Sequence, residues 1–163
     1  MRGDHDIQLF DPATVRRYRL GSLRFGDLAF CTVTLDVCRD GEPLNLKSFI
    51  ADLDIPVIAG GVGDYRTAMH LMRTGAAGVI VGYGYTPGVT TTDSVLGIGV
   101  PMATAIADAA AARRDYLDET GGRYVHVIAD GSIGRSGDVS KAIACGADAV
   151  MVGSPLARAD EAP

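Results

Sequence analysis

The sequence predicts an α/β fold built on a parallel sheet, and three observations lead to this prediction. Short runs of β-branched and small apolar residues alternate with helical patterns from residue 28 onward. Each run is almost continuously apolar, which is typical of strands covered on both faces. The 163 residues, 47% hydrophobic and only 21% charged, are enough for a domain with a core. We therefore expect one globular domain of repeated strand–helix units.

Five strands and four helices are predicted in alternation. Asp64 and Asp138 stand where a carboxylate can accept the first free backbone N–H groups of a helix. Pro101 suits a first helical turn and Gly121 suits a helix end. The first 24 residues show no clear period, so we read them as loop or poorly formed helix. The predicted strands are 28–35, 56–60, 77–83, 125–130 and 148–153, and the predicted helices are 45–53, 64–74, 101–120 and 137–145.

An internal repeat narrows the fold class. The stretch "VIAGG…RTGAAGVIVG" (57–82) matches "VIADG…ACGADAVMVG" (127–153), so a strand–helix–strand unit occurs twice. No reversal of strand order and no G-x-G-x-x-G turn is indicated, which favours a (βα)8 barrel over a doubly wound sheet. A complete barrel has eight strands in typically ~250 residues. We therefore predict a partial (βα)8 TIM barrel, the carboxyl-terminal half, over residues 26–163, with residues 1–25 unassigned.

The composition argues against several classes of partner. A formal charge of −5 provides no basic face for nucleic acid, and no run of eighteen apolar residues could cross a membrane. The first residues do not resemble a signal peptide, so a cytoplasmic location is expected. The three cysteines, Cys31, Cys38 and Cys145, include no C-x-x-C pair. We read them as small buried hydrophobes rather than as a disulfide framework or a metal site.

Glycine and polar residues cluster at two repeat-equivalent strand ends, "ADGSI" (129–133) and "VGSP" (152–155). Ligands of such barrels lie at the carboxyl ends of the strands, and phosphate often binds after the last two. Small residues with free backbone N–H groups and hydroxyls let a phosphate approach closely, although such residues can also simply turn the chain. The candidate phosphate ligands are Gly131, Ser132, Gly153 and Ser154.

Other polar residues have less specific interpretations. Asp130 at its strand end could accept hydrogen bonds from ribose hydroxyls, or it could cap a turn. His126 is read as a packed core histidine, His70 as a surface residue, and the charges at 112–115 as a solvated helix face.

With these strand ends in view, "DIPVIAGGV…TGAAGVIVGYG…TTTDSVLGIGVP…VHVIADGSI…GADAVMVGSP" resembles the IMP dehydrogenase/GMP reductase family, and more narrowly its actinobacterial paralogue without the CBS-domain insert. The resemblance is collinear over about residues 40 to 163. It implies an oxidoreductase of purine nucleotide metabolism and GMP biosynthesis. Its members bind a purine nucleoside monophosphate (IMP, XMP or GMP) beside NAD or NADP.

The resemblance also implies roles for individual residues. Asp130 matches the ribose-binding aspartate, while Gly131, Gly153 and Ser154 match the phosphate cradle, in which Ser132 replaces a glycine. Gly82 and Gly84 fall on the cofactor side, where Gly61 and Ile80 replace the usual asparagine and arginine.

Thr90 occupies the position of the family's cysteine, which attacks C2 of the purine. A thiol with a pKa of about 8.5 supplies some thiolate near neutrality, whereas an alcohol needs a dedicated base. The sequence therefore leaves alternatives open. The chain is a truncated or impaired NAD(P)-dependent oxidoreductase, a non-catalytic nucleotide-binding or structural paralogue, or a phosphate-binding barrel for another metabolite.

A final expectation concerns assembly. Strands 28–35 and 148–153 should form the two open edges of the arc. Its inner face would also be apolar, so we expect a homo-oligomer or an aggregation-prone chain.

Overall fold

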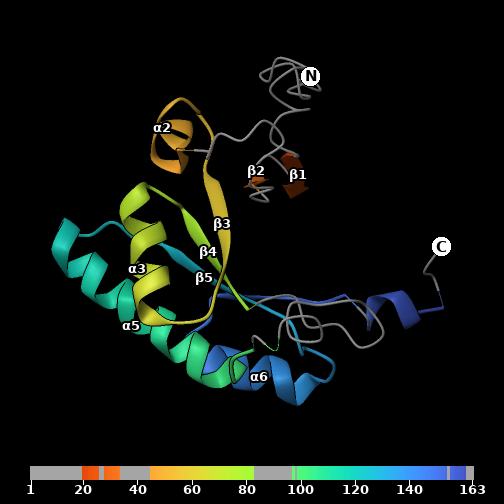
Figure 1. Ribbon diagram of the computed structural model, residues 1–163. Coiled ribbons are helices and arrows are strands. Elements are labelled where there is room, and N and C mark those ends of the chain that lie inside the picture. Colours follow the sequence, from red (N-terminus) through yellow and green to blue (C-terminus); the bar gives the residue numbers. More distant parts are fainter. Residues whose placement is uncertain are drawn as a thin grey trace.

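The sheet contains six strands that follow one another in space in the order of the sequence, with helices between them (Figure 1). This computed structural model describes residues 20–25, 28–33, 45–82, 97, 99–153 and 155–160, the first two ranges as backbone only. Its elements are β1 (Leu20–Phe25), β2 (Leu28–Val33), α2 (Leu46–Ala51), β3 (Val57–Val62), α3 (Tyr65–Thr74), β4 (Gly78–Val81), α5 (Met102–Thr120), β5 (His126–Asp130), α6 (Ser136–Ala144), β6 (Ala149–Met151) and the 3₁₀ turn η1 (Leu156–Arg158).

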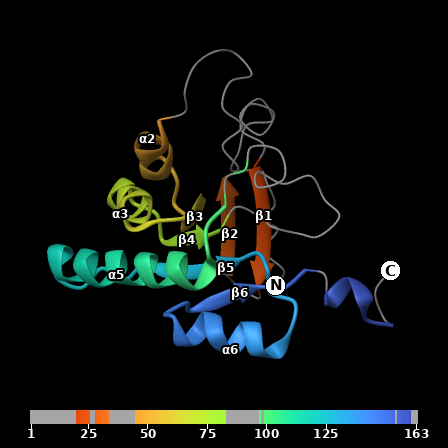
Figure 2. The same ribbon diagram turned by 60° about the horizontal axis from the view of Figure 1, so that its bottom comes forward.

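The five strands from β2 to β6 pair in parallel, each with the next along the chain. Each parallel pair from β2 onward is connected by a helix: α2, α3, α5 and α6 in turn. Most of the stretch between β4 and α5 lies outside the described residues. This arrangement confirms the predicted α/β fold class and the five predicted parallel strands. Figure 2 shows α2, α3, α5 and α6 following one another along the same side of the strands, as in an arc of a (βα)8 barrel.

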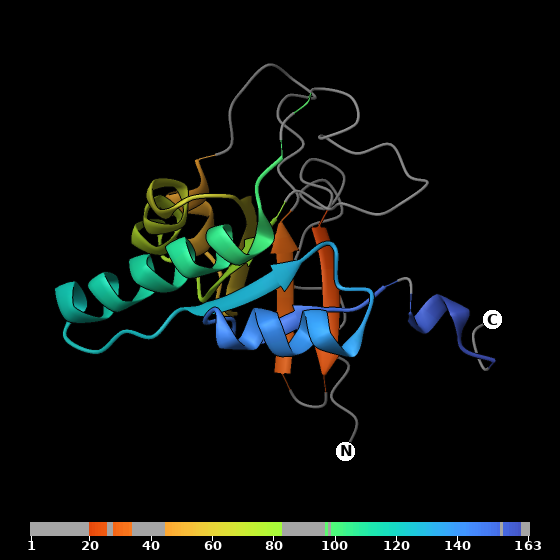
Figure 3. The same cartoon turned by 90° about the horizontal axis from the view of Figure 1, so that it is seen from below.

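The first strand corrects one prediction. Residues up to 24 are read above as loop or poorly formed helix, but residues 20–25 form β1. This strand pairs antiparallel with β2 from Leu20↔Val33 to Phe25↔Leu28. In the sequence Gly26-Asp27 separates two apolar runs by two residues, which is a hairpin signal of its own. The strand at 28–33 is therefore not an edge of the sheet, as predicted, because β1 covers it (Figure 3). β6 is the last strand of the sheet, as predicted.

The core lies between the sheet and its helices. Ala59, Val79 and Val127 stand side by side in register on β3, β4 and β5, and each is at most 2% exposed. Ile80 and Ile128, on the next row, alternate to the other face and are only half-buried. Helix α5 presents mostly alanines to this core, which lets it pack close to the strands. Its buried residues are Ala105, Ile106, Ala109, Ala110, Ala112 and Tyr116.

The sequence repeat is also a structural repeat. Gly75 after α3 and Gly146 after α6 have φ angles of 110° and 111°, a conformation that glycine adopts far more readily than other residues. After each glycine comes a buried alanine, Ala76 or Ala147. The two turns then make equivalent backbone hydrogen bonds, Ala77 N–H to Val57 O and Asp148 N–H to Val127 O, both at 2.8 Å.

The helix ends partly follow prediction. Asp64 caps α3 by accepting the backbone N–H groups of Arg66 and Thr67 at 2.8 and 3.0 Å. Asp138 lies inside the first turn of α6 rather than at its start, because α6 begins at Ser136. Its carboxylate still accepts backbone N–H groups, those of Gly134 and Arg135.

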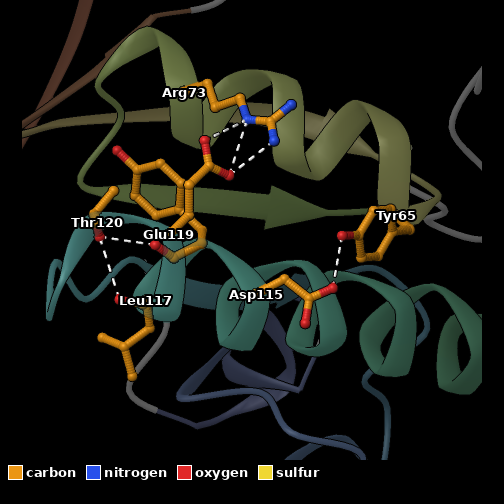
Figure 4. A network of polar contacts seen from close by, with 7 residues as sticks. Tyr65, Arg73, Asp115, Leu117, Glu119 and Thr120 are labelled. Carbon is orange, nitrogen blue, oxygen red and sulfur yellow. Dashed lines mark hydrogen bonds and ion pairs between the residues drawn. The ribbon is translucent and has the colours of Figure 1, made fainter.

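Polar contacts join α3 to α5 on the outer surface (Figure 4). The Tyr65 hydroxyl donates to Asp115 at 2.7 Å, and Arg73 donates to Glu119 at 2.8 Å. These pairs are exposed to solvent, so each contributes little beyond fixing how the two helices lie.

The predicted solvated face at 112–115 is only partly solvated. Ala112 is fully buried, and Arg113 forms an ion pair with Asp148 at 2.6 Å with only 14% of its side chain exposed. The helical period explains this, since residues 112, 113 and 116 turn toward the sheet while 114 and 115 turn outward.

Of the two histidines interpreted from the sequence, one is placed as predicted and one is not. His70 is exposed on α3, as predicted. His126 is exposed and not part of the core, because it occupies the first position of β5, where no described helix covers it. Its ring packs edge-on against Tyr124, with 5.2 Å between centroids.

Candidate nucleotide site at the carboxyl ends of the strands

Parallel pairing brings the carboxyl ends of β4, β5 and β6 to one edge of the sheet. Val81 pairs with Ala129 and Asp130 pairs with Met151, so the residues that follow each strand leave the sheet side by side. The predicted ligands Asp130, Gly131, Ser132 and Gly153, together with Gly82, therefore belong to one edge. Ser154, Gly84 and Thr90 lie outside the described residues.

Asp130 is the ionisable group of this edge. Its side chain is half-buried, and it accepts no hydrogen bond and forms no ion pair with any other described residue. Burial alone raises the pKa of Asp130 above its ordinary value. The alternative reading as a turn cap thus gains no support within the described part of the chain. A carboxylate in this state has its acceptor capacity available for hydroxyl donors.

The turn after Asp130 has an unusual backbone. Gly131 has φ 112° and Ser132 has φ 58°, the only non-glycine residue with positive φ among those described. Two successive residues of this kind turn the chain sharply away from the strand end. At position 132 any residue other than glycine costs about 1–2 kcal/mol, because it adopts the left-handed region. The backbone conformation therefore explains why the family resemblance implies glycine here.

Gly153 has room beside it. A Cβ built on Gly153 would meet no described atom within 4 Å, and the residue is exposed. Its small size is therefore not required by packing among the described residues. Open space at the end of β6 is compatible with the predicted approach of a phosphate.

Gly82 has a different environment. It is buried with φ 115°, and a Cβ there would lie 2.0 Å from the backbone oxygen of Asp130 and 3.1 Å from Met102 Sδ. Packing alone thus requires glycine at the end of β4. Its assignment to the cofactor side remains a prediction that the described surroundings do not support.

Sequence reasoning missed two close neighbours of this edge. Met102, the first residue of α5, lies beside Gly82. Gly60 on β3 leaves room for Ile80, since a Cβ at Gly60 would meet the Ile80 oxygen at 2.5 Å. The glycine pair in "VIAGG" was the available signal, because glycine inside a strand often marks a close approach of another backbone.

The described residues contain no group of three or more His, Cys, Asp or Glu side chains arranged to hold a metal ion. None of the described helices is both long and apolar enough to span a membrane.

The parallel arc and its repeated glycine turns define part of a (βα)8 barrel. Comparison with known proteins supplies the family. The profile of the IMP dehydrogenase/GMP reductase domain matches residues 44–163. The chain belongs to the IMP dehydrogenase/GMP reductase family.

Individual relatives agree with this assignment. A Mycobacterium tuberculosis protein named as an uncharacterized oxidoreductase is 79% identical over 126 residues, which are 77% of this chain and 34% of that protein. The inosine-5'-monophosphate dehydrogenase of Pasteurella multocida is 51% identical over 111 residues, 68% of this chain and 21% of that enzyme.

A solved structure is similar as well. The crystal structure of an IMP dehydrogenase/GMP reductase-like protein from Corynebacterium glutamicum superposes with a TM-score of 0.69 at 65% identity, covering 80% of this chain and 34% of that one. The chain therefore spans about a third of the length of the first relatives it matches.

Proposed function

We propose that this chain carries the nucleotide-binding edge of an NAD(P)-dependent purine-nucleotide oxidoreductase of the IMP dehydrogenase/GMP reductase type. The carboxylate of Asp130 carries this proposal. It lies half-buried at the end of β5 without a partner among the described residues, next to a turn in which Gly131 and Ser132 both have positive φ angles. A purine nucleoside monophosphate (IMP, XMP or GMP) would place its ribose hydroxyls on Asp130 and its phosphate near Gly131, Ser132, Gly153 and Ser154.

Calorimetric titration with IMP and GMP tests the nucleotide site. Replacing Asp130 with Asn should weaken binding by about 10- to 100-fold, because a charged acceptor contributes about 1.5–3 kcal/mol per hydrogen bond. The Asp118→Asn variant, at an exposed position near the end of α5, should bind as the wild type does. Absence of binding by the wild-type chain would refute the nucleotide site.

The pH dependence gives a second readout of Asp130. Ribose hydroxyls donate to the ionised carboxylate, so binding should weaken as the pH falls through the raised pKa of Asp130. The nucleotide phosphate also titrates in acid, but its contribution is present in Asp130→Asn too. The difference in the pH dependence of binding between the wild type and Asp130→Asn therefore reports the contribution of Asp130 alone.

A non-catalytic paralogue is the second candidate, and Thr90 favours it. An alcohol at the position of the family's cysteine lacks the thiolate that attacks the purine. Replacing Thr90 with Cys should allow covalent trapping of a C2-reactive nucleotide analogue, detected by mass spectrometry, if the site is otherwise intact. NAD- or NADP-linked turnover of IMP, XMP or GMP by the wild-type chain would exclude this second candidate.

The nicotinamide side is proposed from the family alone. Gly82 is buried against Asp130, so it presents no surface to a cofactor, and we derive no step through NAD or NADP. We further propose that residues 26–163 form the barrel part of the domain, to whose first strand β1 pairs, and that the chain acts in the cytoplasm as a homo-oligomer.

A further inference from the structure

The turn between β5 and α6 has a backbone that its surroundings must hold in place. Residues 131–135 lead from the end of β5 at Asp130 to the start of α6 at Ser136. Gly131 and Ser132 both have positive φ angles, and a strained backbone of this kind persists only where neighbouring groups fix it. The proposed phosphate site depends on this turn, because both residues belong to it.

Two side chains hold the second half of the turn. Ile133 is half-buried and packs against the larger core cluster. Beyond it, Asp138 Oδ2 accepts the backbone N–H groups of Gly134 and Arg135 at 3.3 and 3.1 Å. Gly134 is exposed, and a Cβ there would meet no described atom within 4 Å. Among the described side chains, Asp138 is therefore the one that fixes the end of the turn.

Comparison with Asp64 shows that Asp138 does more than cap a helix. Asp64 precedes α3 and accepts the N–H groups of Arg66 and Thr67, which lie inside the helix. Asp138 lies inside α6 and accepts N–H groups of residues that precede this helix. The carboxylate at the start of α3 thus holds its own helix, whereas the carboxylate of α6 holds the turn that leads from the candidate site.

We propose that Asp138 is a positioning residue for the phosphate of the nucleotide. It holds the turn 131–135 so that Gly131 and Ser132 are already ordered when the phosphate arrives. A turn ordered in advance binds more tightly, because the cost of ordering it is not subtracted from the binding free energy. This inference rests on the proposed nucleotide site and adds to it a residue that does not touch the ligand.

The charge of Asp138 separates positioning from a direct effect on the ligand. A carboxylate and a phosphate repel each other, so a direct electrostatic effect would make binding tighter when the carboxylate is removed. Lys141 Nζ lies 3.9 Å from Asp138 Oδ1 and offsets part of this charge. Positioning predicts the opposite result, which is weaker binding when the acceptor oxygen is lost.

Calorimetric titration of the full chain with IMP tests this role. Asp138→Ala should weaken binding roughly 3- to 20-fold, because the turn must then be ordered on binding. Asp138→Asn should bind at least as tightly as the wild type does, because the amide oxygen of asparagine can accept the same two N–H groups and the negative charge is gone.

Asp64→Ala is the matched control for a general loss of stability. It also removes a carboxylate that accepts two backbone N–H groups at the start of a helix, so it should lower the midpoint of urea denaturation about as much as Asp138→Ala does. Its binding of IMP should equal that of the wild type, since Asp64 holds no part of the turn 131–135.

Hydrogen exchange of the free protein gives a readout that needs no nucleotide. In Asp138→Ala the amides of Gly134 and Arg135 should exchange roughly tenfold faster than in the wild type, because they lose their acceptor. Asp64→Ala should leave the exchange of these two amides unchanged.

Several results would overturn the positioning role while the nucleotide site stands. One is IMP binding that Asp138→Ala leaves unchanged or makes tighter. Another is equal weakening by Asp64→Ala, which would trace the loss to general destabilisation. Failure of Asp138→Asn to restore binding would show that the acceptor oxygen is not what matters. Absence of IMP binding by the wild type would instead refute the nucleotide site, and this inference with it.

Discussion

Asp148 shows how one side chain at the start of β6 joins separate parts of the chain. It accepts hydrogen bonds from Arg113 of α5 at 2.6 Å, from the Tyr124 hydroxyl at 2.6 Å and from the Val127 backbone N–H at 2.8 Å. Burial by itself would raise the pKa of Asp148, but these three donors outweigh it and lower the pKa overall. This cluster lies at the end of the strands opposite to Asp130.

Replacing Asp148 with Asn should lower the free energy of unfolding at pH 7 by about 2–3 kcal/mol, because partly buried donors lose a charged acceptor. The stabilisation by the carboxylate is complete above the ordinary aspartate pKa near 3.8 and is lost as the pH falls through the lowered native value. Urea denaturation of both proteins at several pH values should therefore show the difference narrowing in acid. A difference that stayed constant with pH would mean that ionisation of Asp148 contributes nothing.

Replacing Ser132 with Gly should raise the free energy of unfolding by about 0.5–1 kcal/mol. The change removes the strain of φ 58°, and this gain exceeds the extra entropy of glycine in the unfolded chain. Ser140→Gly within α6 is the control and should have the opposite sign, about 1 kcal/mol of destabilisation. Thermal unfolding measures both, and destabilisation by Ser132→Gly would contradict the backbone argument.

At the scale of elements, the sequence predicted most of the strands and helices because two signals, the continuous apolar runs and the internal repeat, were strong. Continuous apolar runs marked β3, β4 and β5, and the repeat with its glycines located the turns after α3 and α6. The sequence could not predict the exposure of His126 or the burial of Arg113, since each depends on which neighbouring element covers the side chain. β1 was missed because its six residues, "LGSLRF", are too short and mixed to show a period, and the hairpin signal of Gly26-Asp27 was not used.

Two glycines that follow helices allow the energetic cost of a steric contact to be separated from the cost of a positive φ angle. Gly146→Ala should destabilise the protein by about 2–4 kcal/mol, because φ is 111° and the new methyl group would lie 2.6 Å from Ala110 Cβ. Gly121→Ala, after α5, meets no described atom within 4 Å and has φ 69°, so it should cost only about 1 kcal/mol. Equal effects in chemical denaturation would show that the contact with Ala110 relaxes freely.

At the scale of the whole molecule, the described core is uneven. One cluster of buried residues joins α3, α5 and α6 to the central strands, while a second and smaller one lies beneath α2. The smaller cluster consists of Leu46, Phe49, Val57, Ala59 and Ala76. The candidate site adjoins the larger cluster, and the repeat-equivalent strand ends indicated which residues would meet at one edge of the sheet, while their binding roles stay predictions. The sequence could not predict that Asp130 has no partner among the described residues or how closely Gly82 packs, because both depend on distances between strands.

Native-state hydrogen exchange should therefore show that α2 opens before the rest. The amides at the end of α2, around Asp52, should be protected on the order of a hundredfold less than those in the middle of α5, because fewer buried contacts hold α2. Uniform protection of the two helices would contradict this, and would show that both belong to one cooperative unit.

The contact between Gly82 and the Asp130 carbonyl makes the ends of β4 and β5 a stiff joint. No space remains between the two backbones, so a force that displaces Asp130 must carry Gly82 with it. In the sequence, the segment after Gly82 leads to Thr90. On the proposed binding mode, a nucleotide held by Asp130 would thus be coupled through Gly82 to the start of that segment.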